Sequence, residues 1–222
     1  HTSIADHLWT YWTGSRPDVQ ALTMRLAQRE ASFERSFALT DLNQTEVATF
    51  TQRPAELPLH LNQRTNRIEF DHDLAADWAR FQFLKQIWMD TVKWAALAEN
   101  PLWTNALRML GQFLLREVLA NRTAWDAAFE AAEGAGLRLA LNILLDALCL
   151  DPDAERFLTE RVVLLFANDA KHFTSLLIRF HHIATVPTRN DSDNSSSFGL
   201  YLDARYRSVV IGRWPPVLRF LI

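Results

Sequence analysis

Hydrophobic residues recur at helical spacing along the first part of the chain. The apolar positions of residues 4–12 predict a first helix, which the Gly-Ser-Arg-Pro run over 14–17 ends. Pro17 marks the start of a second helix, because proline is favoured in the first helical turn, and we expect this helix to end near residues 35–37. Its buried stripe is expected at five positions: Val19, Leu22, Leu26, Ala27 and Phe33.

The pattern then changes from helical spacing to alternation. A short helix is expected around residues 46–50. Apolar and polar residues alternate over 57–61 and again over 67–70, with a polar turn at 62–66 between them, which predicts a β-hairpin. Three helices followed by one hairpin is the layout of a winged helix, in which the hairpin is the wing. We therefore expect a winged-helix domain over residues 1–72.

From Asp73 onward the chain has the pattern of successive amphipathic helices of about 11 to 25 residues. Polar, glycine or proline residues interrupt the pattern at five places: residues 100–101, 121–123, 134–136, 151–153 and 168–169. Stacked helical hairpins bury such apolar stripes on both sides, although no strict sequence repeat is visible. We expect residues 73–222 to form HEAT/armadillo-like helical hairpins, as the start of a longer α-solenoid. The fold class expected for the whole chain is thus mostly α, and a polar loop is expected over residues 187–197.

Composition narrows the possible functions. The 222 residues are 49% hydrophobic and carry a formal net charge of −3, with basic and acidic residues interleaved, so a non-specific nucleic-acid or anionic-membrane binder is not expected. The apolar runs are far shorter than the ~20 residues of a membrane span. Cys149 is the single cysteine, which excludes an intrachain disulfide and favours a cytoplasmic location. Its apolar flanks should raise its pKa and make the thiol inert.

The motifs of common catalytic sites are missing from the sequence. None of the six glycines belongs to a phosphate-binding Gly-x4-Gly-Lys-Ser/Thr loop. His181 and His182 are adjacent on a predicted helix and point in different directions, and His172 lies nine residues earlier, so no metal site is expected. The chain is therefore not expected to be an enzyme, and no catalytic residue or cofactor is assigned to it.

The strongest candidate for a binding site is the junction at residues 67–74. A short strand there ends at Asp71-His72-Asp73 and turns directly into an amphipathic helix, which places His72 at a helix N-terminus. Helix N-termini favour anions, because unpaired N–H groups and the positive end of the macrodipole lie there. The residues alone leave two interpretations open. His72 is a phosphate sensor, or it is a capping or core histidine that is hydrogen-bonded where the strand meets the helix, beside Asp73, which is itself a suitable N-cap.

The junction resembles the Met-His-Asp motif of STAND-class signal-transduction ATPases, the NACHT and NB-ARC proteins of immune receptors and bacterial antiphage systems. The match is the string Phe70-Asp71-His72-Asp73-Leu74, followed by Asp77-Trp78, with Asp71 in place of the usual methionine. In that family the motif closes a winged helix and precedes a helical superstructure. The resemblance therefore covers the whole chain, although its motifs are short.

The resemblance implies a regulatory role in signal transduction, in antiphage or stress defence. His72 would contact the β-phosphate of ADP and hold the resting state closed, and Asp73 would orient the backbone of His72. ADP or ATP with Mg²⁺ would be bound by a nucleotide-binding domain of the same polypeptide, outside this chain. The repeats would relay binding of a protein target, and activation would include formation of an oligomer. The chain ends also suggest a segment, because it begins at His1 without Met and stops inside a predicted helix.

Two alternatives remain at this level. The first is a stand-alone helical-repeat scaffold that binds protein partners, in which His72 is structural. The second is a DNA-binding winged-helix regulator. Residues 41–56 contain one basic residue, Arg53, against three carboxylates, and only Arg64 and Arg67 on the hairpin favour this second alternative, so phosphate contacts would be few.

Overall fold

The structure is a computed structural model, which describes most of the chain. It describes residues 4–32, 37–120, 122–187, 207–209 and 214–221. Within these residues the protein is mostly helical, as the sequence predicts, and it has three small antiparallel sheets, two of them in the region for which the sequence predicts helices alone. The chain divides into two compact units, residues 1–110 (unit 1) and 111–222 (unit 2).

Unit 1 begins with the two predicted helices, α1 (Ile4–Thr13) and α2 (Pro17–Ala31). Pro17 is the first residue of α2, as expected from its fixed φ. The helix ends earlier than expected, because the backbone N–H of Ser32 bonds back to the carbonyls of the last turn. Four of the five predicted stripe positions are buried, and Phe33 lies outside the described residues.

The predicted hairpin is present and belongs to a three-stranded antiparallel sheet. Its strands are β1 (Phe37–Ala38), β2 (Leu59–Asn62) and β3 (Arg67–Phe70), in the order β1-β3-β2. The sequence pattern misses β1, because two residues cannot show alternation. Helix α3 (Gln44–Thr51) lies between β1 and β2 in sequence and begins at Asn43, whose side chain accepts the backbone N–H of Glu46 in a capping box.

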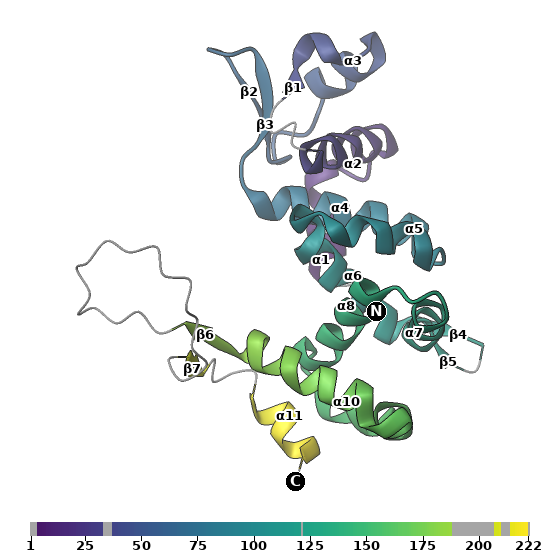
Figure 1. The fold of residues 1–222 in the computed structure, drawn as a ribbon. Helices are drawn as coiled ribbons and strands as arrows, with labels where there is room; N and C mark the ends of the chain where they lie inside the picture. Colours follow the sequence, from purple (N-terminus) through teal and green to yellow (C-terminus); the bar gives the residue numbers. More distant parts are fainter. Residues whose placement is uncertain (1–3, 33–36, 121, 188–206, 210–213, 222) are drawn as a thin grey trace, which may run out of the picture. The chain divides into compact units, whose positions relative to one another are not determined.

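One apolar cluster joins α2, α3 and the sheet. It contains these buried residues: Val19, Leu22, Leu26, Phe37, Leu42, Phe50, Leu57, Leu59 and Ile68. Helix α2 also packs against α4 (Asp73–Ile87), so α2 lies between the sheet with α3 and α4 (Figure 1). The position of α4, and of its N-terminus, therefore depends on α2.

The chain breaks after α4 at a place that the hydrophobic pattern does not mark. Asp90 accepts the backbone N–H of Lys93 and starts a new helix, α5 (Thr91–Ala96), directly after the apolar Trp88 and Met89. Two short 3₁₀ turns follow, η2 (Leu97–Glu99) and η3 (Pro101–Trp103), which form the break expected at residues 100–101. They lead into α6 (Thr104–Arg116).

A buried arginine holds these helices of unit 1 together. Arg80 on α4 is 3% exposed. Its guanidinium donates to the carbonyl of Ala27 on α2 (Nε, 3.2 Å) and to that of Leu102 in η3 (Nη1, 3.0 Å). It also pairs with Asp77 one turn earlier (2.8 Å) and with Glu30 on α2. Four partners from three elements thus satisfy one buried charge, as a buried ion requires.

Unit 2 is built from helices and two short hairpins. Its helices are α7 (Ala124–Gly134), α8 (Arg138–Leu150), α9 (Ala154–Glu160), α10 (Val162–Ala184) and α11 (Trp214–Leu221). The hairpins pair β4 (Val118–Leu119) with β5 (Arg122–Thr123) and β6 (Thr185–Pro187) with β7 (Arg207–Val209). The breaks expected at residues 134–136 and 151–153 are confirmed as the α7–α8 and α8–α9 junctions.

The break expected at residues 168–169 is a left-handed turn inside α10. Asn168, Asp169 and Ala170 have φ values of 50°, 57° and 57°, and none of them is glycine. For an L-residue this left-handed conformation costs roughly 1–2 kcal/mol of free energy, and the cost is smallest for asparagine and aspartate. The packing of α10 against neighbouring elements, such as α8, must therefore offset the cost of the turn.

Neighbouring helices of unit 2 pack in pairs, α7 with α8, α8 with α10 and α9 with α11. Trp125 on α7 is fully buried, and its Nε1 donates to the carbonyl of Leu144 on α8 at 2.9 Å. The division between the two units falls inside α6. The expected domain boundary at residue 72 stays a prediction, and the loop expected over 187–197 lies almost entirely outside the described residues.

Replacing Arg80 by methionine tests the role of its network. We expect Arg80→Met to lower the free energy of unfolding by about 3–5 kcal/mol, because Asp77 and Glu30 would be left as unpaired charges in a buried site. The measurement is urea unfolding followed by far-UV circular dichroism. Arg122→Met is the matched control: its pair with Glu130 is exposed and should contribute about 1 kcal/mol or less. Equal effects of the two changes would contradict the central role of Arg80.

Candidate functional site

The candidate site is the turn from β3 into α4. His72 has extended backbone angles (φ −160°, ψ 153°) and is the N-cap of α4, and its Nδ1 accepts the backbone N–H of Ala75 at 3.1 Å. The capping role that the sequence leaves open for His72 is therefore confirmed, and the assignment of the cap to Asp73 is wrong. Asp73 is the first helical residue, where its carboxylate lies near the positive end of the helix dipole. The imidazole of His72 thus accepts the backbone N–H of Ala75, the kind of helix N–H that the side chain of a serine, threonine, aspartate or asparagine cap usually accepts.

The cap sets the chemistry of the imidazole. A ring nitrogen that accepts a hydrogen bond carries no proton, so neutral His72 holds its proton on Nε2. Nε2 is on the opposite side of the ring from the capped N–H, and the His72 side chain is exposed. His72 thus offers one N–H donor to a ligand in front of α4.

An aromatic pair supports the imidazole of His72. The ring of Trp12 on α1 lies 5.9 Å from the His72 ring and stacks on Trp78 of α4 at 4.8 Å. Leu74 lies one turn before Trp78 on α4 and is 51% exposed. We call these four residues, His72, Leu74, Trp12 and Trp78, the His72 face. It combines one polar donor with partly uncovered apolar side chains.

The hairpin holds the turn from the other side. The backbone N–H of Asp71 donates to the carbonyl of Pro58 at 3.1 Å. The side chain of Asp71 pairs with His60 on β2, with 2.6 Å between Oδ1 and Nδ1. Sequence reasoning missed His60, although the hairpin register could have indicated it, since His60 lies opposite Glu69 across the ladder.

Arg53, the basic residue after α3, is used inside unit 1. Its Nε donates to the carbonyl of Leu59 (3.0 Å), its Nη1 donates to that of Phe50 (2.8 Å), and its guanidinium lies 3.9 Å from the Phe50 ring centroid. Burial lowers the pKa of Arg53. A guanidinium engaged in this way is poorly placed to contact DNA phosphates, which weighs against the DNA-binding alternative.

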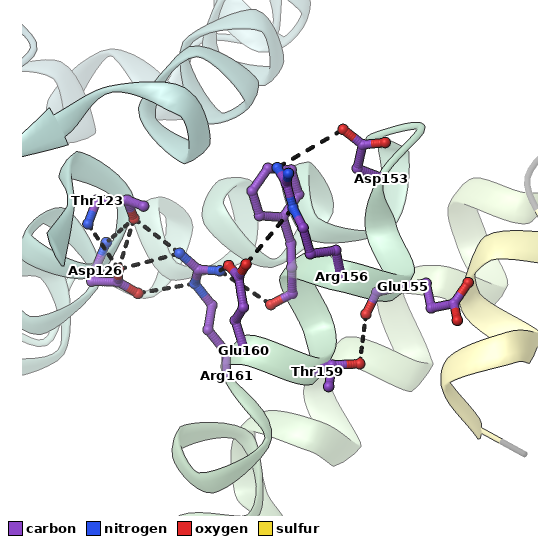
Figure 2. A network of polar contacts seen from close by, with 9 residues as sticks. Thr123, Asp126, Asp153, Glu155, Arg156, Thr159, Glu160 and Arg161 are labelled. Atoms are coloured by element: carbon purple, nitrogen blue, oxygen red, sulfur yellow. Dashed lines mark hydrogen bonds and ion pairs between the residues drawn. The ribbon is translucent and has the colours of Figure 1, made fainter.

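A second polar cluster lies in unit 2, around Arg161 (Figure 2). Arg161 is 5% exposed, and its Nε lies 2.9 Å from Oδ1 of Asp126. Its Nη2 donates to Oγ1 of Thr123 at 2.9 Å, and the guanidinium lies 4.9 Å from the ring centroid of Trp125. Asp126 and Thr123 also form the capping box that begins α7. Arg161 therefore ties the start of α7 to the α9–α10 junction, which is a structural role.

The neighbouring charges on α9 are exposed and paired. Arg156 points toward Asp153 and Glu160 in Figure 2, at 3.9 Å and 3.7 Å. Arg219 on α11 lies 3.5 Å from Glu155. Exposed pairs at such distances contribute little stability, and their charges nearly balance. This cluster carries no functional assignment.

Cys149 is buried on α8, as its apolar flanks suggest. Burial, with a smaller contribution from the nearby Asp146 carboxylate, raises the pKa of the thiol to about 12, and Arg179 opposes the shift. Asp146 is itself paired with Arg179 of α10 through two contacts of 2.5 Å and 2.6 Å. The thiol therefore stays protonated at neutral pH and is a poor nucleophile.

The described part of the chain contains no group of three or more His, Cys, Asp and Glu side chains arranged to hold a metal. His172, a buried histidine of α10, pairs with Glu133 on α7 at 2.8 Å. In the same residues, no helix has both the length and the apolar character that crossing a membrane requires.

Comparison of the chain with protein-family models, with curated proteins and with solved structures gave no match. The resemblance of residues 70–78 to the Met-His-Asp motif therefore stays a hypothesis. It depends on the motif, on its place at the start of α4, and on the geometry of His72.

Cys149 should resist thiol reagents in the native protein. We expect no reaction with 5,5′-dithiobis(2-nitrobenzoate) at pH 8 and one thiol released in denaturant, because the pKa of about 12 keeps the folded thiol protonated. The unfolded thiol ionises near pH 9, so the free energy of unfolding should fall as pH rises from about 9 to about 12. Rapid modification of the native protein would contradict this burial.

The cap can be measured separately from any ligand. His72→Ala removes the acceptor for the Ala75 N–H and should lower the free energy of unfolding by about 1 kcal/mol. His72→Asn keeps an acceptor and should restore most of the loss. Urea unfolding of the three proteins gives the comparison, with His7→Ala as a control at an exposed histidine of α1. Wild-type stability of His72→Ala would rule out the cap.

Proposed function

We propose that this chain is the regulatory segment of a STAND-type signal-transduction ATPase, in antiphage or stress defence. In this proposal His72 contacts the β-phosphate of ADP held by a nucleotide-binding domain of the same polypeptide. The observation that carries the proposal is the geometry of His72: it caps α4 through Nδ1 and keeps Nε2 on its exposed side.

The surroundings of Nε2 suit a phosphate. The donor lies at the N-terminus of a 15-residue helix, where the macrodipole attracts anions. The cap needs the neutral imidazole, so the ring binds the phosphate as an N–H donor rather than as an imidazolium. Asp73 in the first turn places a carboxylate near the positive end of the helix dipole, which stabilises the helix end.

The apolar side chains of the His72 face support the proposal that another domain covers this surface. Leu74 is half exposed and lies one helical turn before Trp78, whose ring stacks on Trp12. Apolar side chains grouped around a polar donor are typical of a surface that another domain covers. Closure of the nucleotide-binding domain onto this face would bury these side chains and bring the phosphate to Nε2.

The fold of each unit agrees with the architecture that we propose. Residues 1–72 would be the winged helix, with the β2–β3 hairpin as the wing, and the sheet order β1-β3-β2 with α3 between β1 and β2 supports this. The packed helix pairs of unit 2 support HEAT/armadillo-like hairpins that continue into a longer solenoid. The repeats would relay binding of a protein target to the ATPase, and activation would include oligomer formation in the cytoplasm.

The contact would work as a two-state switch. ADP shifts the equilibrium toward the closed state only by interactions that exist in that state alone. One charge-assisted hydrogen bond is worth about 1.5–3 kcal/mol, so its loss would change the ratio of open to closed protein by roughly 10- to 100-fold. The chain would thus regulate the ATPase without taking part in hydrolysis, which needs ATP and Mg²⁺ in the absent domain.

The proposal is tested in the full-length protein that contains this chain. We expect His72→Ala to reduce the ADP that co-purifies and to raise basal signalling, because the closed state loses its phosphate contact. His72→Asp keeps a cap acceptor but repels the phosphate, so it should behave like His72→Ala in both assays. His7→Ala is the control and should match wild type.

The upstream reading frame provides an independent test. A phosphate-binding loop and an acidic Walker B strand encoded before residue 1 would agree with the proposal. A start codon directly upstream would favour the stand-alone scaffold. Wild-type ADP content and basal activity in both His72 variants would overturn the assignment of His72 as the nucleotide sensor.

A further inference from the structure

We propose that His60 is a positioning residue for His72, acting through its pair with Asp71. The inference rests on the proposed function, because it concerns how the same site is held in place. The observation behind it is the 2.6 Å contact between Nδ1 of His60 and Oδ1 of Asp71. His60 lies in β2, and Asp71 directly follows β3.

The register of the hairpin brings the two side chains together. Leu59 pairs with Phe70 and His60 pairs with Glu69, so Asp71 lies just beyond the last ladder pair. Its backbone N–H still bonds to Pro58 at 3.1 Å. Asp71 is thus attached to the β2 side of the hairpin twice, through its backbone and through its carboxylate.

Asp71 is also the residue directly before the cap. The direction in which the chain enters α4 is set by the backbone between Asp71 and Asp73, and the imidazole of His72 leaves from the middle of that segment. Fixing Asp71 on β2 therefore fixes where the His72 ring begins. The cap to Ala75 and the contact with Trp12 then fix how the ring is turned.

The charges around this pair explain why a histidine is suited to it. Glu69 and Asp71 are two residues apart along an extended segment, so their side chains share one side and repel each other. The Nε2 of His60 lies 3.7 Å from Oε2 of Glu69, while its Nδ1 bonds to Asp71. Arg53 also interacts electrostatically with Asp71. His60 can donate to Asp71 when neutral and pairs with both carboxylates when protonated.

The departure from the family motif at Asp71 creates the partner that His60 contacts. Asp71 stands where the motif has methionine, and its carboxylate can accept a hydrogen bond that a methionine side chain would not take. His60 supplies it from the opposite strand. The structure thus links an unusual motif residue to a specific residue 11 positions earlier.

The test compares three variants in two assays. His60→Ala removes the donor, His60→Asn keeps an N–H near the position of Nδ1, and Glu69→Gln removes the charge of the more distant carboxylate. The first assay is ¹⁵N NMR of the 222-residue chain with labelled histidine, which reports whether Nδ1 of His72 is unprotonated and accepts a hydrogen bond. The second is the ADP content of the full-length protein.

We expect His60→Ala to lose the distinct Nε2–H signature of His72 and to lower ADP retention about threefold to tenfold, the worth of one side-chain hydrogen bond. His60→Asn should restore both, and Glu69→Gln should stay near wild type. Wild-type behaviour of His60→Ala in both assays would overturn the inference, as would equal losses in His60→Asn and His60→Ala.

The outcomes separate this inference from the proposed function. If His72→Ala releases ADP but His60→Ala alters neither the NMR signal of His72 nor the ADP content, the proposed function is supported and the positioning role of His60 is rejected. If His72→Ala leaves ADP unchanged, the nucleotide contact falls, and the NMR signature of His72 in His60→Ala still decides whether His60 positions the ring.

Discussion

The arrangement of unit 1 depends on the buried guanidinium of Arg80. A charge with 3% exposure must be fully satisfied, so its partners cannot be exchanged freely. Two are backbone carbonyls, of Ala27 and Leu102, and these fix the distance between α2, α4 and η3. Asp77 extends the network by accepting from Asn105 at 2.9 Å. Because α4 cannot shift without breaking these bonds, its N-terminus, and with it His72, has one position relative to the sheet.

In unit 2, arginine–carboxylate pairs also link neighbouring helices. Arg161 binds Asp126, Arg179 binds Asp146, and both carboxylates belong to helices that are otherwise apolar on their buried sides. Apolar stripes alone allow neighbouring helices to slide past one another at little cost. A buried ion pair gives the contact a defined register, which is the best supported role for such pairs, since their net contribution to stability is small.

Local signals were enough to predict part of this fold. Pro17 located the start of α2, and alternation located the hairpin, because each depends on residues within a few positions. Features that depend on partners far along the chain were missed, such as strand β1 and the pair of His60 with Asp71. The candidate site shows the same limit. The sequence placed His72 at a helix N-terminus and allowed a capping role for it, but only the structure shows that His72 rather than Asp73 is the cap and which nitrogen remains available.

The left-handed turn at Asn168–Ala170 stores free energy in unit 2. The 23 residues of α10 contain no glycine or proline, so the break that the polar Asn168 and Asp169 mark falls on three residues that must each adopt a left-handed conformation. As a consequence, the first half of α10, which carries the exposed Val163 and Phe166, runs in a different direction from the second half.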